Sequence, residues 1–226
     1  RQPTVAVPAA VAGAIRILST APWLSRQECA PASPWAQIQE DAPPGNPIAL
    51  QPSPVLGIHP GVAAALRCDA SPHFGCGGIS FTDHFVFHAP WSHSPHSPEA
   101  LAISSTLAEA IGALILFVEG GRPGLNVIST DSEALTSLFL KGYSSTCPLT
   151  NETLVLLRGH AIAIGATIQV VHILRRFNST SDRLAAGLPF SQIQHLISRE
   201  SGHSLEDVHS LFSTRTVPSA QTILDL

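Results

Sequence analysis

Short apolar runs fill the stretch from residue 62 to residue 88 and predict three β-strands. The runs are VAAALRCDA (62–70), GCGGISF (75–81) and HFVFH (84–88). Their length and apolar content are typical of strands, and the short connections between them favour an antiparallel meander.

Longer apolar stretches with helical spacing begin after these strands. Ser97 and Pro98 suit the N-cap and first position of a helix, which we expect to run from residue 98 to residue 118, before the sequence EGGRPG. LNVIST (125–130) and TIQVVHIL (167–174) predict two further strands, the second ending near His172. Three shorter helices are predicted over residues 132–141, 150–165 and 181–187. The order β-β-β-α-β-α-α-β-α indicates an α/β protein with a mixed sheet covered by helices.

Proline divides the chain into three parts. Eleven of the 19 prolines lie in residues 1–60, which we interpret as an N-terminal arm or linker. Residues 61–189 carry the pattern of one compact domain. Residues 190–226 are polar and rich in Ser and His, and we expect a C-terminal tail with one short helix around Ser191–Arg199.

Composition narrows the classes of protein. The 226 residues are 44% hydrophobic, enough for one full core, and no apolar run approaches the roughly 18 residues of a membrane span. A net charge of −4, with only 12 Lys and Arg residues, disfavours nucleic-acid binding through a broad basic surface. The four cysteines lack zinc-site spacing, so buried reduced thiols are expected. Since the chain begins with Arg1 and contains no methionine, we expect it to be a piece of a longer polypeptide.

Glu109 is the only charged residue between residues 100 and 118 of the predicted long helix. Small residues share its helical face, so this face can press closely on the sheet and hold the carboxylate in a poorly solvated place. A buried carboxylate needs a cation or hydrogen-bond donors, and we expect a metal ion or a basic partner. The alternative is that this part of the helix is exposed and that Glu109 faces water.

Three other acids each have a structural interpretation. Asp69 could close an Asx-turn, Asp131 could cap the helix that follows it, and Asp182 suits the first turn of the last helix. All three, with Glu109, are nevertheless predicted at one edge of the same sheet. Four carboxylates converging there would repel one another unless divalent cations bound between them.

These residues carry a resemblance to a known family. The motifs CDASPHFGCGG, LAEAIGALILF, VISTDSEAL and VHILRRFNSTSDRLAAG occur in this order between residues 66 and 189. This part of the chain resembles the ribonuclease H domain of reverse transcriptases, in the form found in DIRS-type (tyrosine-recombinase) retroelements. The resemblance implies an α/β ribonuclease H-like fold with a mixed five-stranded sheet, three strands antiparallel and two parallel, flanked by helices.

The resemblance also implies a two-metal nuclease site. Two Mg²⁺ ions, or Mn²⁺ in their place, would activate water for attack on a phosphodiester and stabilise the leaving oxygen. The catalytic and metal-binding residues implied are Asp69, Glu109, Asp131 and Asp182. Glu99 is the alternative to Glu109, but the number of residues between Glu109 and Asp131 better fits one helix, one turn and one strand.

Further residues receive roles from the same resemblance. His172 corresponds to a mobile catalytic histidine that helps to deliver water or release product. Substrate-binding roles fall on Ser71 and on Asn178, which would either position its loop or contact substrate. Arg175 and Arg176 depart from the family pattern, and by residue type they could bind substrate phosphate. The substrate implied is the RNA strand of an RNA–DNA hybrid, the partner a reverse transcriptase domain in the same polyprotein, and the location intracellular, in cytoplasm or nucleus, without a membrane.

Two departures from the family pattern leave a second hypothesis open. The histidine loop has Arg175 and Arg176 where the family commonly has glycine, and Ser132 follows Asp131 where Asn is commoner. A catalytically decayed ribonuclease H-like domain, with a structural or weak binding role, is therefore the alternative. A transposase or integrase core is disfavoured, because its acids would not be followed by the His-Asn-Asp segment.

Four histidines, in the third predicted strand and in the Pro/Ser-rich loop that follows it, raise the question of zinc. They lack matching acid or thiol spacing, so a solvated loop is favoured over a metal site. The histidines are His84, His88, His93 and His96.

Overall fold

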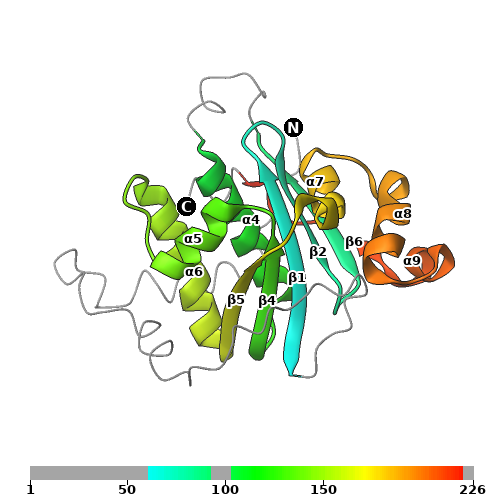
Figure 1. The fold of residues 1–226 in the computed structure, drawn as a ribbon, viewed down its shortest axis with the longest axis horizontal. Helices are drawn as coiled ribbons and strands as arrows, with labels where there is room; N and C mark the ends of the chain where they lie inside the picture. Colours follow the sequence, from blue (N-terminus) through cyan, green and yellow to red (C-terminus); the bar gives the residue numbers. More distant parts are fainter. Residues whose placement is uncertain (1–60, 93–102, 221–226) are drawn as a thin grey trace.

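A computed structural model describes residues 61–92 and 103–220 as a mixed sheet with helices on both faces (Figure 1). The predicted arm, residues 1–60, lies outside the described residues. The strands are β1 (Val62–Ser71), β2 (Gly75–Ser80), β3 (Phe85–Pro90), β4 (Gly124–Thr130), β5 (Ala166–His172) and β6 (Ser213–Thr214). The helices are α4 (Ser105–Gly120), α5 (Glu133–Lys141), α6 (Pro148–Ile164), the 3-10 helix η1 (Arg175–Phe177), α7 (Ser179–Ala185), α8 (Phe190–Ser201) and α9 (Leu205–Leu211).

The sheet has the order β5-β4-β1-β2-β3-β6. β1, β2 and β3 form an antiparallel meander, while β4 runs parallel to β1 and β5 runs parallel to β4. The predicted fold class is confirmed, but the sheet has six strands rather than five. β6 pairs with β3 over only two residues, too few to leave a periodic pattern in the sequence.

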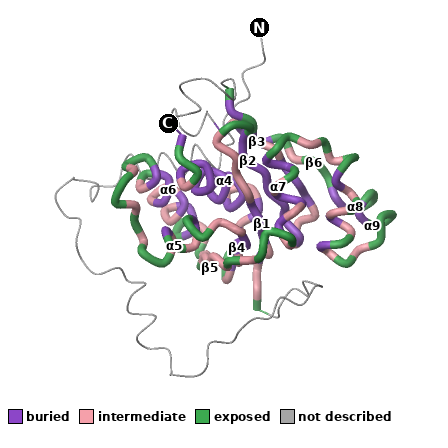
Figure 2. Tube along the Cα trace, turned by 45° about the horizontal axis from the view of Figure 1, so that its top comes forward, coloured by how far each residue is buried: buried purple, intermediate pink, exposed green. Residues whose placement is uncertain are grey.

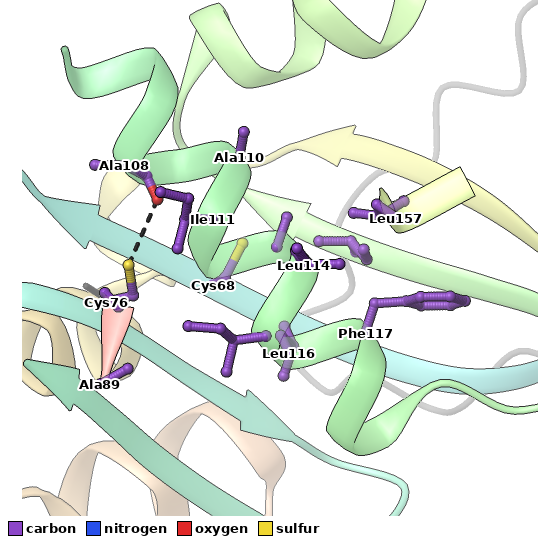
Figure 3. Packing of buried hydrophobic residues seen from close by; sticks show 14 of the residues in the cluster. Cys68, Cys76, Ala89, Ala108, Ala110, Ile111, Leu114, Leu116, Phe117 and Leu157 are labelled. Atoms are coloured by element: carbon purple, nitrogen blue, oxygen red, sulfur yellow. Dashed lines mark hydrogen bonds between the residues drawn. The ribbon is translucent and has the colours of Figure 1, made fainter. Parts of the chain in front are cut away.

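The larger core lies between the sheet and the helices α4, α5 and α6. α4 is buried along most of its length, as the purple trace in Figure 2 shows, and its apolar side chains pack on β1 and β2. Cys68 and Cys76 lie in this core with free thiols, and the Cys76 thiol donates to the carbonyl of Ala108, 3.5 Å away (Figure 3). No helix in the described ranges is long and apolar enough to cross a membrane.

A second core lies on the opposite face of the sheet, beneath α7, α8 and α9. Its buried members include Ile79 and Val86 from the sheet, Leu184 from α7 and Ile193 and Ile197 from α8. The prediction of a tail beginning at residue 190 is therefore wrong for residues 190–220, which complete this core. The predicted helix around Ser191–Arg199 is confirmed as α8, whereas α9 was not predicted.

The long helix starts later than the sequence suggested. Residues 103 and 104 are not helical, and the Ser104 hydroxyl caps α4 by accepting from the Leu107 amide at 3.2 Å. The predicted cap at Ser97 lies outside the described residues, but the helix cannot run unbroken from residue 98. Ser104 and Ser97 are equally suitable caps by residue type, so the sequence did not separate them.

Candidate active site

Three parallel strands bring their carboxyl ends to one edge of the sheet. Arg67 on β1 pairs with Ser129 on β4, and Thr130 on β4 pairs with His172 on β5. Asp69 and Asp131 follow these pairs by one or two residues. The ends of parallel strands meet at one edge, which places Asp69, Asp131 and His172 along it.

Glu109 projects from α4 toward Asp69. Its side chain is buried, with 5% of the residue exposed, so the alternative that Glu109 faces water is wrong. Burial, followed by the charge of Asp69 and a hydrogen bond to that carboxylate, raises the pKa of Glu109 to about 9. Burial and the nearby charge of Asp131 raise the pKa of Asp69 to about 6. At neutral pH the Glu109 carboxyl is therefore protonated, and its O–H group donates a hydrogen bond to the Asp69 carboxylate.

One atom of this carboxyl pair has no partner. Glu109 Oε2 is buried and forms no hydrogen bond. A buried carboxyl oxygen left unsatisfied is costly, and it is a ready ligand for a hard cation that enters the site.

Asp131 and Asp182 lie on either side of an arginine. The Arg175 guanidinium is 2.9 Å from Asp182 Oδ1 and 4.0 Å from Asp131 Oδ2. Asp69 interacts electrostatically with both of these acids, so the four carboxylates lie together at the sheet edge. The Arg175 side chain is 79% exposed, and little packing opposes its movement away from the acids.

Asn178 connects two strands of the site. Its side-chain amide donates to Asp131 Oδ1 at 2.5 Å and to the Cys68 carbonyl at 3.1 Å. The residue is fully buried. This geometry fits positioning of the loop and of Asp131 rather than direct contact with a substrate.

Of the three structural interpretations given for the single acids, only that of Asp182 agrees with the structure. Ser132, not Asp131, caps α5 by accepting from the Leu135 amide at 3.1 Å, so that prediction is wrong. Asp69 lies within β1, and the backbone amide from which it accepts belongs to the adjacent Ala70, so it closes no Asx-turn. Asp182 does lie in the first turn of α7.

A glycine lets α7 approach the sheet closely enough for Asp182 to reach the other acids. Gly77 pairs with Asp69 across β1 and β2. A methyl group at Gly77 would overlap the backbone nitrogen of Ala185 and come within 2.6 Å of the Leu184 side chain. The backbone of α7 therefore rests directly on β2.

The donor chemistry of the site fits a hard divalent cation, although the arrangement shown is not a finished metal site. In residues 61–92 and 103–220, no group of three or more His, Cys, Asp or Glu side chains is arranged to hold an ion. Arg175 lies among the acids instead. The fit rests on the all-carboxylate donor set and on the unsatisfied Glu109 Oε2.

The remaining predicted site residues lie around this edge. His172 is exposed at the end of β5, and the Arg176 guanidinium lies 4.8 Å above the Phe177 ring. The Ser71 hydroxyl accepts from the His73 amide at 3.2 Å. Glu99, the rival to Glu109, lies outside the described residues.

The two of the four histidines that the structure describes lie in or beside the predicted third strand and not in a solvated loop. His88 lies in β3 with its Nε2 atom buried and unsatisfied, and the His84 ring packs against Phe212. His93 and His96 lie outside the described residues.

Sequence reasoning missed two charged residues near the site. Arg67 and Glu200 form a buried ion pair with a separation of 2.6 Å. Arg67 interrupts an apolar strand two residues before Asp69, and this was a usable signal. Glu200 gave none, because it falls in the segment interpreted as a tail.

Comparisons with known proteins were made by sequence and by structure. No family model matches the sequence, and the search of curated proteins finds no match. Solved structures similar to this chain are ribonuclease H domains. The N-terminal RNase H domain of a Mycobacterium tuberculosis protein, solved as a fusion with maltose-binding protein, has a TM-score of 0.37 and 18% identity over 54% of this chain and 94% of that chain. RNase H1 from the halophilic archaeon Halobacterium salinarum has a TM-score of 0.39 and 14% identity over 54% of this chain and 92% of that chain.

Proposed function

We propose that this chain is a divalent-metal-dependent ribonuclease that cleaves the RNA strand of RNA–DNA hybrids, as part of a retroelement reverse transcriptase polyprotein. The observation that carries the proposal is the contact between the buried carboxyl of Glu109 and the partly buried carboxyl of Asp69, with Asp131 and Asp182 within electrostatic reach. Like charges at short range raise one another's pKa, so acids that have no common ligand are seldom crowded together in this way.

Each residue has a proposed task. Asp69, Glu109, Asp131 and Asp182 would hold Mg²⁺, or Mn²⁺ in its place. When bound, this metal would supply an activated water and stabilise the leaving oxygen of the phosphodiester. Asn178 keeps Asp131 oriented through its 2.5 Å hydrogen bond, which a charge-free amide can do without competing for the cation.

Arg175 has two positions in this proposal. Its ion pairs with Asp131 and Asp182 neutralise the acids, and they must break before both carboxylates can turn to a metal. Once released, the exposed guanidinium, together with Arg176, is suited to bind substrate phosphate. His172, exposed at the end of β5, would help to deliver the attacking water or to release product.

Arg175 also supports the second candidate function. A guanidinium between two of the four acids, with no metal-holding group formed in the described part of the chain, is what a decayed site would contain. In that case the domain would keep its fold and bind nucleic acid or a partner without cleaving.

A cleavage assay separates these candidates. A labelled RNA–DNA hybrid is incubated with the full chain in Mg²⁺, in Mn²⁺ or in EDTA, beside the matched DNA and RNA duplexes. We expect metal-dependent cleavage of the RNA strand of the hybrid alone. Asp131→Asn should lower the rate by about 100-fold or more, since it removes a metal ligand.

Asp83→Asn is the matched control. Asp83 forms an ion pair with Arg122 at the turn between β2 and β3, away from the carboxyl ends of β1 and β4, and its loss should leave the rate within about twofold. Absence of cleavage by the folded, unmodified chain in either metal would reject the nuclease and favour the decayed domain.

A further inference from the structure

A buried ion pair connects the segments of the chain that carry two of the four acids, Asp69 and Asp182. Arg67 Nη1 and Glu200 Oε2 are 2.6 Å apart, and their side chains are only 5% and 4% exposed. Arg67 belongs to β1, two residues before Asp69, whereas Glu200 belongs to α8. The pair therefore joins the strand that carries the first acid to a helix outside the predicted domain.

Both members of the pair also bind the segment from Phe177 to Thr180, which runs from the end of η1 into the first turn of α7. Arg67 Nη1 donates to the carbonyl of Phe177 at 2.5 Å, and Glu200 Oε1 accepts from the amide of Thr180 at 3.1 Å. These two contacts lie on either side of Asn178, whose side chain holds Asp131. Thr180 is two residues before Asp182. The segment from Phe177 to Thr180 is thus fixed at two points by one ion pair.

Stability alone is a poor explanation for this arrangement. Taking two charges out of water costs several kcal/mol per ion, and apolar side chains of similar volume often serve a core as well or better. The second core around α8 already contains Ile193 and Ile197, which could extend to such a site. An apolar pair could not bind the backbone carbonyl of Phe177 and the backbone amide of Thr180.

We propose that Glu200 is a positioning residue for the carboxylate site: with Arg67 it fixes residues 177–180 and so holds Asp131 and Asp182 where a divalent cation can bind both. The inference rests on the proposed function, because it concerns the metal affinity of that site. It also gives α8 a role beyond covering the sheet.

The test is a Mn²⁺ titration of the full chain. The electron paramagnetic resonance signal of free Mn²⁺ measures how much metal remains unbound. Glu200→Gln keeps the shape of the side chain but removes its charge. We expect Mn²⁺ affinity to fall by about 10-fold, the size seen when groups supporting metal ligands are lost. The metal concentration for half-maximal cleavage should rise in parallel, with the KM for hybrid unchanged.

Ile197→Ala is the matched control on the same helix. Ile197 is fully buried in the second core. Its truncation should lower the melting temperature at least as much as Glu200→Gln does, yet leave Mn²⁺ affinity within about twofold. A variant with Arg67→Met and Glu200→Met retains volume without charge, so it provides a folded test if the single variant does not fold. It should show the same loss of affinity.

The outcomes separate the two proposals. Equal Mn²⁺ affinity in Glu200→Gln and the unmodified chain would overturn the positioning role alone, as would an equal loss in Ile197→Ala. Failure of the unmodified chain to bind Mn²⁺ would overturn the metal-dependent nuclease and the positioning role with it.

Discussion

The carboxyl of Glu109 is a buried acid whose protonation is tied to that of Asp69. Because both pKa values are raised above those of the unfolded chain, the folded state binds protons more tightly than the unfolded state does. The stability that these groups contribute is therefore complete below pH 3.8, the ordinary pKa of Asp69, and is lost as the pH rises to about 9, the raised pKa of Glu109.

Metal-free protein should accordingly become less stable with rising pH. Between pH 5 and pH 9 in EDTA, we expect the free energy of unfolding to fall by a few kcal/mol, on the order set by 1.4 kcal/mol per pKa unit. Glu109→Gln should show a smaller fall, because the amide does not titrate. Urea denaturation of both proteins at several pH values measures this, and equal pH dependence of the two would contradict it.

The burial of Glu109 was predictable from the sequence, because a single charged residue in an otherwise apolar helix is buried with the residues around it. The sequence predicted that a metal ion or a basic group would offset the charge of Glu109. In the structure, a proton held between Glu109 and Asp69 offsets that charge instead. For Asp131, adjacent residues of similar capping ability were the difficulty: Ser132 is as good a cap, and only the backbone conformation decides between them.

At the scale of elements, the position of α7 depends on Gly77. Gly77→Ala would push the helix off β2, because the atoms in the way belong to its backbone. We expect a loss of about 2 kcal/mol in unfolding free energy, together with weaker Mn²⁺ binding through the displacement of Asp182. Denaturant unfolding and metal titration of one preparation would measure both effects.

Gly112→Ala is the control for this substitution. A methyl group at Gly112, on α4, would lie 3.4 Å from the Cys76 side chain and 3.6 Å from the Asp69 carbonyl, which are ordinary contacts. Replacing a helical glycine should leave stability unchanged or raise it by up to about 1 kcal/mol. Marked destabilisation of this variant would show that the α4 face needs small residues more strictly than the structure indicates.

Elements with several turns or several paired residues were predicted well, because their periodicity reflects burial on one face. β4, α5 and β5 agree with the sequence to within about two residues. α9 was missed because it is only seven residues long and contributes one buried side chain, Val208, to its core.

At the scale of the molecule, the two faces of the sheet are covered by parts of the chain that are far apart in sequence. Residues 190–220 supply much of the second core, including Ile193, Ile197 and Val208. Polar composition hid this, because an amphipathic helix needs only a narrow apolar stripe to dock.

Truncation after residue 189 should therefore abolish cooperative folding. It would expose Ile79, Val86 and Leu184 to water, at roughly 1.5–3 kcal/mol for each large side chain, which together approach the whole stability of a domain. Removal of residues 221–226 alone provides the control. Circular dichroism during urea unfolding measures the loss of cooperativity. A cooperative transition in the shorter chain would show that the domain ends at residue 189, as the sequence pattern suggests.

The ion pair between Arg67 and Glu200 spans 133 positions of the chain. During synthesis, a nascent polypeptide that has emerged only as far as α7 already contains all four acids but not the carboxylate that anchors residues 177–180. By the proposed positioning role, the ability to bind metal would then arise only after α8 has been made. A protease that cut between α7 and α8 could remove this ability without changing any of the four acids.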